Sequence, residues 1–275
     1  MAESKVSSKR SDDDLFVVIL AGGIGSRFWP ASTPSRPKQL LALATDSPLV
    51  VDTFRRAAGI VPVNQVRLLA NARLTAAFQA LPEQWEDDVY WVEPRARGTC
   101  PALAWAAWSI ERECPGAVMI SLHSDHLIEP LDDFQRTISA AVELARNREI
   151  LVCIGAVPDR IETGYGHIQP GESIALESEI EASTVSAFHE KPNATNAERY
   201  LQEGYLWNTG MFVWKASTFL NEVRVNAPEI GACLPLLEES PEAFFDAVPE
   251  GPVDTMVLER SACVGVVQAS FSWDD

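Results

Sequence analysis

Three closely spaced glycines follow the first apolar run of the chain, Leu15 to Leu20, in the segment Leu20-Ala21-Gly22-Gly23-Ile24-Gly25-Ser26-Arg27-Phe28-Trp29-Pro30. A strand that ends in such glycines lets the backbone turn with positive φ and bring bare N–H groups close to phosphate oxygens. Arg27, Arg36 and Lys38 add three cations at or soon after this turn. The segment therefore predicts a strand-to-helix loop that binds a nucleoside triphosphate.

The spacing of these glycines excludes the two commonest phosphate-binding loops. A Walker A loop ends in Gly-Lys-Ser/Thr, whereas Gly25 is followed by Ser26 and Arg27. A dinucleotide-binding fingerprint needs a third glycine that lets helix and strand pack closely, and that position is Phe28. An ordinary tight turn between strand and helix is the remaining alternative, which the neighbouring cations disfavour.

The composition is that of a soluble globular protein with an acidic balance. The 275 residues are 47% hydrophobic and 22% charged, with a net charge of −17, so the chain can bury a substantial core in a single domain. The acidity argues against nucleic acid or an anionic membrane as a partner, because both require a basic face. The composition leaves the formation of a homodimer as an open possibility.

Cysteine usage and the amino-terminal segment indicate the compartment. The five cysteines include no Cys-x-x-Cys pair, so neither a zinc site nor a disulfide framework is indicated. Residues 1–14 are polar and lack the apolar core of a signal sequence. We expect them to be a disordered polar tail on a cytoplasmic protein, followed by one domain over residues 15–275.

Strand-like and helix-like segments alternate along the first part of the chain, which is typical of an α/β fold. Buried strands are expected at Leu15–Leu20, Val66–Ala70, Val89–Val92, Ala117–Leu122 and Leu151–Val157, and helices at Leu49–Ala58, Ala72–Leu81, Ala102–Arg112 and Phe134–Arg146. After about residue 160 the expected elements are the strand Ser183–His189, the helix Ala194–Gln202 and the strand Met211–Lys215. We predict a Rossmann-like, mostly parallel mixed sheet flanked by helices, with the later segment covering the substrate.

A polar segment, His123-Ser124-Asp125-His126, follows directly after one predicted strand. Ligands of open α/β sheets bind outside the carboxyl ends of the strands, so Asp125 should face the same crevice as the glycine loop. Mg²⁺ takes one or two carboxylates together with phosphate oxygens and water, which makes Asp125 a candidate ligand; capping of the following segment is the alternative. His123, Asp125 and His126 also suggest zinc, but three ligands this crowded at a strand end rarely reach one tetrahedral ion.

The pattern Gly-Gly-x-Gly-x-Arg…Pro-Lys resembles the signature loop of the sugar-1-phosphate nucleotidyltransferases. Trp29-Pro30 and Pro37-Lys38-Gln39 resemble the mannose-1-phosphate guanylyltransferase branch of that family. The resemblance implies a nucleotidyltransferase fold of the GT-A-like type. It also implies that the glycine loop binds the nucleotide through Leu20, Ala21, Gly22, Gly23, Gly25 and Ser26.

A second block is similar to the family's Glu-Pro-x-x-Arg-Asn-Thr-Ala-Pro-Ala stretch, which helps to enclose the nucleotide. It reads Glu93-Pro94-Arg95-Ala96-Arg97-Gly98-Thr99-Cys100-Pro101-Ala102. The resemblance places Glu93, Arg97, Gly98 and Thr99 at the nucleotide. Gly98 stands where the family has Asn, which removes a side-chain hydrogen-bonding group for guanine, and a plain backbone turn would explain this glycine equally well.

Three further blocks resemble the family's sugar-binding motifs: Glu162-Thr163-Gly164-Tyr165-Gly166-His167-Ile168, Glu190-Lys191-Pro192, and Trp207-Asn208-Thr209-Gly210. They imply that Gly164, Tyr165, Glu190 and Asn208 contact the sugar. Glu190 can accept hydrogen bonds from hydroxyls, Asn208 can both donate and accept, and Lys191 offers a compact positive charge for the sugar phosphate. A surface Glu-Lys pair and an Asn-Thr-Gly turn are the alternatives.

The last block, Phe271-Ser272-Trp273-Asp274-Asp275, resembles the family's Trp-x-Asp-Val-Gly-Ser-Trp motif. The aspartate of that motif is a second magnesium ligand and corresponds to Asp275. The sequence stops on this residue, and we expect the rest of the motif and the family's small carboxy-terminal domain to be missing. Because a terminal residue is normally frayed, we expect a loosened metal site.

The resemblance implies transfer of GMP from GTP to mannose 1-phosphate in the presence of Mg²⁺, giving GDP-mannose and pyrophosphate. Arg27 and Lys38 would offset the charge of the leaving pyrophosphate, Asp125 and Asp275 would hold the metal, and Lys191 would steer the sugar phosphate. Two alternatives stay open. One is a nucleotidyltransferase for another base or hexose, and the other is a non-catalytic relative that binds a nucleotide sugar.

Overall fold

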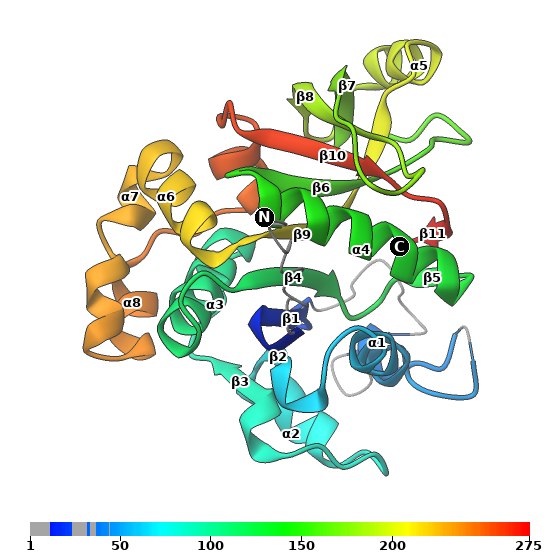
Figure 1. Ribbon diagram of the computed structural model, residues 1–275. Helices are drawn as coiled ribbons and strands as arrows, with labels where there is room; N and C mark the ends of the chain where they lie inside the picture. Colours follow the sequence, from blue (N-terminus) through cyan, green and yellow to red (C-terminus); the bar gives the residue numbers. More distant parts are fainter. Residues whose placement is uncertain (1–11, 24–31, 34–36, 44) are drawn as a thin grey trace, which may run out of the picture.

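The computed structural model describes residues 12–23, 32–33, 37–43 and 45–275 (Figure 1). The predicted loop residues Gly25, Ser26 and Arg27, together with Trp29-Pro30 and Arg36, lie outside the described residues. Of the predicted polar tail, Asp12–Asp14 forms a short 3₁₀ helix, and Asp14 pairs with Arg146.

Within the described residues, nine strands form one sheet in the order β3-β2-β1-β4-β9-β6-β10-β8-β7. The first four strands are parallel to one another: β1 (Leu15–Leu20), β2 (Val66–Asn71), β3 (Tyr90–Glu93) and β4 (Val118–His123). All of β1 is buried because side chains that alternate along a strand face opposite sides of the sheet, and both sides are covered. Phe16 and Val18 enter one hydrophobic core, and Val17 and Ile19 enter the other.

The second part of the sheet is mixed. Its strands are β6 (Leu151–Ala156), β7 (His167–Ser173), β8 (Ala182–His189), β9 (Leu206–Lys215) and β10 (Val264–Gln268). Strand β9 is antiparallel to both β4 and β6, while β10 is parallel to β6. The amino-terminal end of β9 also pairs with β7, so this one strand connects the parallel part of the sheet to the later hairpin.

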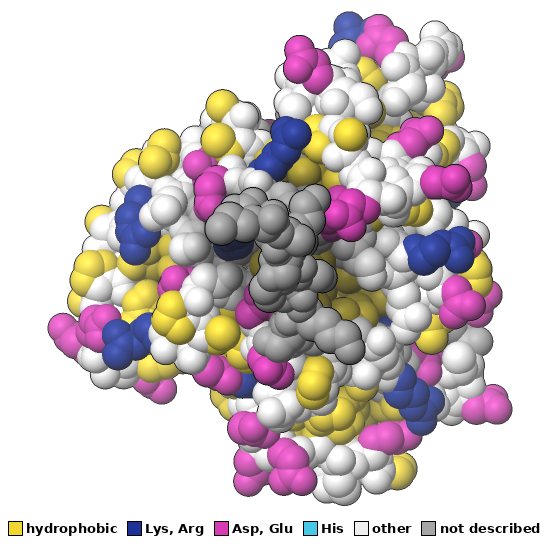
Figure 2. All heavy atoms as spheres, in the orientation of Figure 1, with side chains coloured by type: hydrophobic (Ala, Val, Ile, Leu, Met, Phe, Trp, Pro, Cys, Tyr) yellow, Lys and Arg dark blue, Asp and Glu magenta, His cyan; other side chains and the backbone are white. Residues whose placement is uncertain are grey.

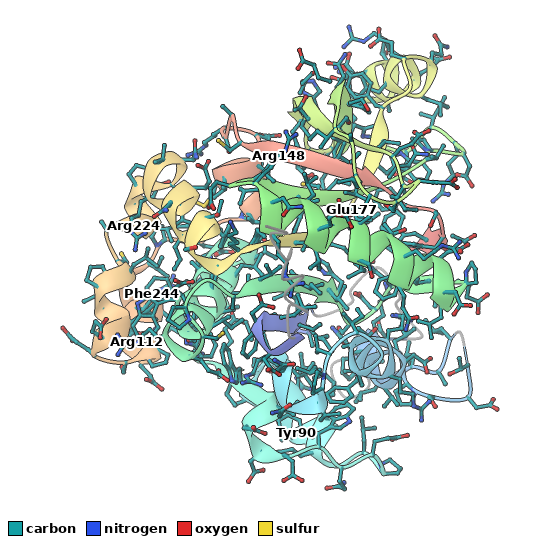
Figure 3. All side chains as sticks on the ribbon, viewed as in Figure 1. Tyr90, Arg112, Arg148, Glu177, Arg224 and Phe244 are labelled. Carbon is teal, nitrogen blue, oxygen red and sulfur yellow. The ribbon has the colours of Figure 1, made fainter. Side chains whose placement is uncertain are left out.

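Helices cover both faces of the sheet. They are α1 (Leu49–Ala58), α2 (Ala72–Gln79), α3 (Thr99–Glu113), α4 (Leu131–Asn147), α5 (Ala194–Gln202), α6 (Ala216–Asn226), α7 (Pro228–Gly231) and α8 (Pro241–Ala247). Residues of α3, α6 and α8 share one core, and residues of α1, α2 and α4 share the other. Phe244 of α8 is fully buried in the first core (Figure 3).

Local sequence explains where several helices begin. Asn71, Asn193 and Ser240 each accept a hydrogen bond from a backbone N–H in the first turn of α2, α5 and α8, respectively. Such caps satisfy backbone donors that have no partner inside the helix. A short two-stranded ribbon of β5 (Leu127–Glu129) and β11 (Ser272–Asp274) lies apart from the main sheet.

The predicted α/β class, with a mixed sheet flanked by helices, is confirmed. The segment Asn208-Thr209-Gly210 lies inside β9, and the predicted strand Met211–Lys215 is the second half of that strand. Acidic side chains are distributed over the face shown in Figure 2, with Lys and Arg between them. Among the described residues, we find no helix with the length and apolar character needed to cross a bilayer.

Candidate active site

The predicted nucleotide loop begins at the carboxyl end of β1, the edge of the sheet where α/β proteins bind ligands. Ala21 extends the pairing of β1 by donating its N–H to Leu69 O at 2.8 Å. Gly22 then passes close to Glu93 at the end of β3, because a Cβ at Gly22 would lie 3.5 Å from Glu93 Oε2. The carbonyl of Gly23 accepts a 2.7 Å hydrogen bond from the buried amide of Gln39. The described start of the loop is thus held by β2 and β3 on one side and by Gln39 on the other.

A buried lysine joins three distant parts of the chain. Lys38 Nζ lies 3.2 Å from Asp125 Oδ2 and 3.3 Å from Asp275 Oδ1, and the lysine side chain is only 6% exposed. Lys38 comes from a 3₁₀ helix (Lys38–Leu40), Asp125 from the turn after β4, and Asp275 from the residue after β11. Burial of an ammonium group is favourable only when it is paired, so the two carboxylates account for its position.

The location of Asp275 differs from the frayed end that we expected. Strand β11 is held by pairing of Trp273 with Ile128 and of Asp274 with Leu127 in β5. The ring of Trp273 also packs edge-on against His126, with ring centroids 5.4 Å apart. These contacts fix the residue before Asp275, which explains why its carboxylate reaches Lys38.

The carboxyl group of Glu93 has an unusual acidity. Burial raises its pKa to about 7, and a hydrogen bond from the backbone of Arg97 opposes this shift. Because it adjoins Gly22 at the glycine loop, its charge near neutral pH depends on small changes in its surroundings. It can therefore remain protonated beside an anionic ligand at a lower cost than an ordinary carboxylate.

Gly98 adopts a backbone conformation that favours glycine, with φ 83° and ψ 176° at the start of α3. A Cβ at this position would lie 2.6 Å from the carbonyl oxygen of Gly251. That carbonyl accepts a hydrogen bond from Cys100 N at 3.1 Å, and Gly251 N donates to Arg97 O at 2.9 Å. The glycine in place of the family's Asn is thus explained by the close approach of a second backbone segment.

Two neighbouring side chains of this predicted nucleotide block hold the same segment. Arg97 Nε donates to Phe245 O at 2.9 Å, and Thr99 Oγ1 accepts a 2.9 Å hydrogen bond from Val253 N. Both side chains thus have structural partners in or just after α8. Their predicted contact with the nucleotide stays a prediction.

The predicted sugar-binding residues meet at a bulge in β9. Asn208 Nδ2 donates to Asp254 Oδ1 at 2.8 Å, Asn208 Oδ1 accepts from Gly210 N at 3.1 Å, and Asn208 N donates to Gly166 O at 2.8 Å. A Cβ at Gly166 would lie 2.7 Å from Glu190 Oε2, so the absence of a side chain permits this approach. Asn208, Asp254 and Glu190 therefore form one polar group.

Asp254 was missed by the sequence reasoning. Burial and the nearby charge of Glu190 raise its pKa to about 6. The signal that could have identified it is a carboxylate within the apolar run Val253–Leu258, most of which is buried. Its partner Asn208 lies 46 residues away in the sequence, so spacing alone gives no indication of the pair.

The remaining predicted sugar residues lie beside this polar group. Lys191 forms an ion pair with Glu190. Tyr165 packs edge-on against Trp207 and Trp273, with centroid distances of 5.4 and 5.0 Å, and Gly164 N donates to Glu162 Oε1 at 2.7 Å. The aromatic rings thus connect the predicted sugar side of the site to the strand that precedes Asp275.

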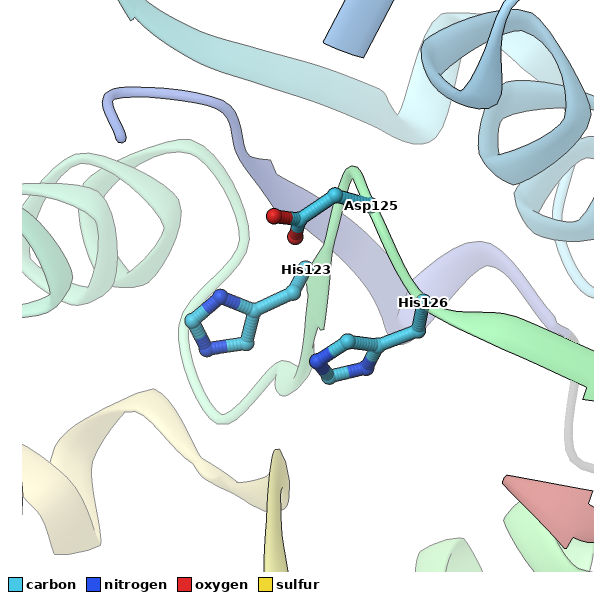
Figure 4. A group of neighbouring side chains, drawn as sticks. All are labelled: His123, Asp125 and His126. Atoms are coloured by element: carbon cyan, nitrogen blue, oxygen red, sulfur yellow. The ribbon is translucent and has the colours of Figure 1, made fainter. Parts of the chain in front are cut away.

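The side chains of His123, Asp125 and His126 lie close together at the carboxyl end of β4 (Figure 4). One potential ligand atom from each residue lies within 4.8 Å of the other two. The two imidazole rings are stacked with centroids 4.9 Å apart. Burial strongly lowers the pKa of His126, and His123, Lys38 and Arg56 lower it further, so this ring is neutral at physiological pH.

Comparison with known proteins defines the family. The Nucleotidyl transferase family model matches residues 16–275, and the chain therefore belongs to this family. It is 36% identical to the mannose-1-phosphate guanylyltransferase of Escherichia coli K12 over 95% of this chain and 57% of that protein. It is 34% identical to the alginate biosynthesis protein AlgA of Pseudomonas aeruginosa over 94% of this chain and 56% of that protein.

A solved structure gives the same result for the fold. The Thermus thermophilus protein described as mannose-1-phosphate geranyltransferase superimposes with a TM-score of 0.85 at 28% identity, over 95% of this chain and 76% of that chain. The nucleotidyltransferase resemblance drawn from the motifs is confirmed. The chain spans about 57% of the length of the curated relative from E. coli.

Proposed function

We propose that the chain transfers GMP from GTP to mannose 1-phosphate, forming GDP-mannose and pyrophosphate. The observation that carries this proposal is the meeting of Lys38, Asp125 and Asp275 beside the glycine loop. The polar group of Glu190, Asn208 and Asp254 provides a separate place for a hexose. The family membership and the names of relatives at 33–36% identity support the same reaction.

The reaction is an in-line displacement. A phosphate oxygen of mannose 1-phosphate forms a bond to the α-phosphorus of GTP while the bond from that phosphorus to the bridging oxygen breaks, and pyrophosphate leaves with that electron pair. Such transfers depend on positioning and charge neutralisation more than on covalent catalysis. The proposal therefore needs cations and hydrogen-bond donors around the phosphates and needs no nucleophilic side chain.

The carboxylates at Lys38 fit a divalent metal ion. Oxygen atoms of Asp125 and Asp275 both lie within 3.3 Å of the same ammonium nitrogen, so they already face a common positive charge. Two carboxylates with open positions for phosphate oxygens and water are a typical Mg²⁺ ligand set. Asp125 and Asp275 would hold the ion, which when bound supplies additional positive charge to the triphosphate.

The other residues divide into a nucleotide side and a sugar side. Gly22 and Gly23 begin the loop whose N–H groups would bind phosphates, and Lys38 places a fixed cation beside them. On the sugar side, Glu190 and Asp254 can accept hydrogen bonds from hydroxyls, and Lys191 can pair with the sugar phosphate. Arg27 belongs to this proposal as a second cation for the leaving pyrophosphate.

One observation favours a second candidate, a nucleotidyltransferase with a different base. Gly98 offers no side chain for guanine, and the carbonyl of Gly251 occupies the place that a side chain would take. Any base contact from this position would have to come from backbone atoms. Base preference and hexose preference should therefore be measured separately.

The test is pyrophosphate release with Mg²⁺, each of the four nucleoside triphosphates, and either mannose 1-phosphate or glucose 1-phosphate. We expect release with GTP and mannose 1-phosphate, and loss of release in Asp125→Asn. Asp132→Asn, an exposed acidic position on α4, is the matched control and should retain the activity. Release with a different triphosphate would favour the second candidate, and no release with any pair would reject the proposal.

A further inference from the structure

The donor set at the carboxyl end of β4 contains nitrogen as well as oxygen. His123 and His126 flank Asp125, and one potential ligand atom from each of the three residues lies within 4.8 Å of the others. Ligand atoms bound to one transition-metal ion at about 2.0–2.2 Å are themselves about 3–4 Å apart. A contraction of about 1–2 Å would therefore bring all three donors onto one ion.

The rings are oriented for this contraction. In Figure 4 the ring of His126 turns a nitrogen toward the space between His123 and Asp125, and the ring of His123 turns a nitrogen toward the Asp125 carboxylate. The opposite edge of His123 lies against Gly210, where a Cβ would come within 2.9 Å of Nε2. Gly210 thus leaves room for the His123 ring to occupy its position beside Asp125.

The ring of His126 is buried beside the cluster. His126 is 4% exposed, and its ring lies between those of His123 and Trp273, with centroid distances of 4.9 and 5.4 Å. The nitrogen turned toward His123 in Figure 4 is Nε2, the one not bonded to Cγ. Imidazole nitrogen is a common ligand of transition-metal ions.

Charged groups of both signs surround the cluster. Asp125 and Asp275 place carboxylates next to Lys38, while Lys38 and Arg56 are the cations near His126. The 3.2 Å ion pair with Lys38 is made by Oδ2 of Asp125. The carboxylate has a second oxygen, Oδ1, which can serve a metal ion on the histidine side.

We propose that His123 and His126 join Asp125 as ligands of a divalent ion, and that this site binds Zn²⁺ or Co²⁺ more tightly than Mg²⁺. Imidazole nitrogen suits Zn²⁺ and its first-row neighbours, whereas Mg²⁺ prefers oxygen ligands. This inference deepens the proposed function, because it assigns the metal preference of the same site. It is the alternative to the expectation from sequence that crowding keeps these three residues from sharing an ion.

Binding of Co²⁺ to the metal-free protein, without nucleotide or sugar, tests the proposal. Titration followed by calorimetry and visible absorption should show tighter binding than for Mg²⁺ and a d–d band typical of nitrogen ligands. His123→Gln and His126→Gln should each weaken Co²⁺ binding about tenfold or more, while leaving Mg²⁺ binding nearly unchanged. His189→Gln is the matched control, because His189 stacks on Tyr200 away from the cluster, and it should bind Co²⁺ as the wild type does.

Wild-type affinity for Co²⁺ in both folded cluster variants would overturn the proposal. If either variant fails to fold, X-ray absorption of the Zn²⁺-loaded wild-type protein decides the same question. Scattering from two imidazole rings supports the site, and an oxygen-only shell rejects it. Because neither measurement uses GTP or mannose 1-phosphate, a negative result here leaves the pyrophosphate assay of the proposed function to be judged separately.

Discussion

Gly98→Ala should destabilise the protein strongly, because the substitution adds a single carbon where two backbone segments meet. Gly98 has φ 83° and ψ 176°, a region of backbone space that is occupied almost only by glycine. Forcing another residue into it costs about 1–3 kcal/mol. The new Cβ would also lie 2.6 Å from Gly251 O and 2.9 Å from Gly251 C.

The second contribution comes from this contact with Gly251. Its carbonyl accepts from Cys100 N at 3.1 Å and its N–H donates to Arg97 O at 2.9 Å, so the segment cannot withdraw without losing a hydrogen bond worth about 1 kcal/mol. The sum is a loss of about 2–4 kcal/mol in the free energy of unfolding. For a domain of this size, each kcal/mol lowers the Tm by about 2–4 °C.

Gly116→Ala provides the matched control. Gly116 has the same φ of 83°, but a Cβ there would meet no described atom within 4 Å. Urea unfolding and calorimetry of both variants then separate backbone strain from the steric contact, and Gly98→Ala should lose at least about 1 kcal/mol more. An equal loss in the two variants would refute the steric argument. Gly98→Asn, which restores the family's residue, should be no better tolerated than Gly98→Ala.

Three further outcomes are expected. Burial raises the pKa of Asp254 from 3.8 to about 6, so its stabilising contribution is complete below about pH 4 and is lost as the pH rises through about 6. Asp254→Asn should remove up to about 3 kcal/mol of this pH dependence, measured by urea unfolding between about pH 4 and pH 8. Equal pH slopes in the two proteins would contradict the assignment. The pKa of Glu93 is raised to about 7, so nucleotide affinity should fall several-fold as the pH rises through about 7, because a carboxylate then repels the phosphates. In binding titrations, Glu93→Gln should abolish this pH dependence. An unaltered pH profile of the variant would place Glu93 away from the nucleotide. Lys38→Met should lower the free energy of unfolding by about 3 kcal/mol, since it removes one partner of a buried ion pair. It should also slow pyrophosphate release about a hundredfold. A variant with wild-type stability and a wild-type rate would exclude the role assigned to this lysine.

The strands buried on both faces could be predicted from sequence. Those at Leu15–Leu20 and Leu151–Ala156 are continuous apolar runs because every residue in them is buried. Strand β7 (His167–Ser173) was missed because it carries Pro170 and Gly171 at irregular pairing with β8, and its last residues are exposed. Only the first two residues of this strand are buried, so it has no apolar run that would mark it in the sequence.

The site was predictable only where a local motif carries it. Lys38 and Asp125 belong to recognisable segments, but their contact joins a 3₁₀ helix to a turn after β4. Asp254 has no motif of its own, and its role follows from the hydrogen bond of Asn208. In the sequence, Gly98 is recognisable as a departure from the family's Asn. The reason for the glycine is the close approach of the Gly251 backbone, which lies more than a hundred residues away in the chain.

The bulge in β9 connects the two sides of the site. The register between β6 and β9 passes from Cys153–Phe212 to Gly155–Asn208, so the residues between Asn208 and Phe212 face Ile154 alone. Thr209 Oγ1 donates to Ile154 O at 2.8 Å and so satisfies a carbonyl that regular pairing would have used.

Bulges of this kind redirect side chains next to active sites. Here the redirection turns Asn208 toward Asp254 and places Gly210, with φ 72°, against His123. The proposed hexose group and the proposed metal ligands are therefore positioned by two residues of one strand, Asn208 and Gly210, which are two positions apart. The substitution Gly210→Ala adds a Cβ within the bulge, 2.9 Å from His123 Nε2. It should alter Co²⁺ binding and sugar-phosphate affinity together, because both sides of the site depend on the path of this strand.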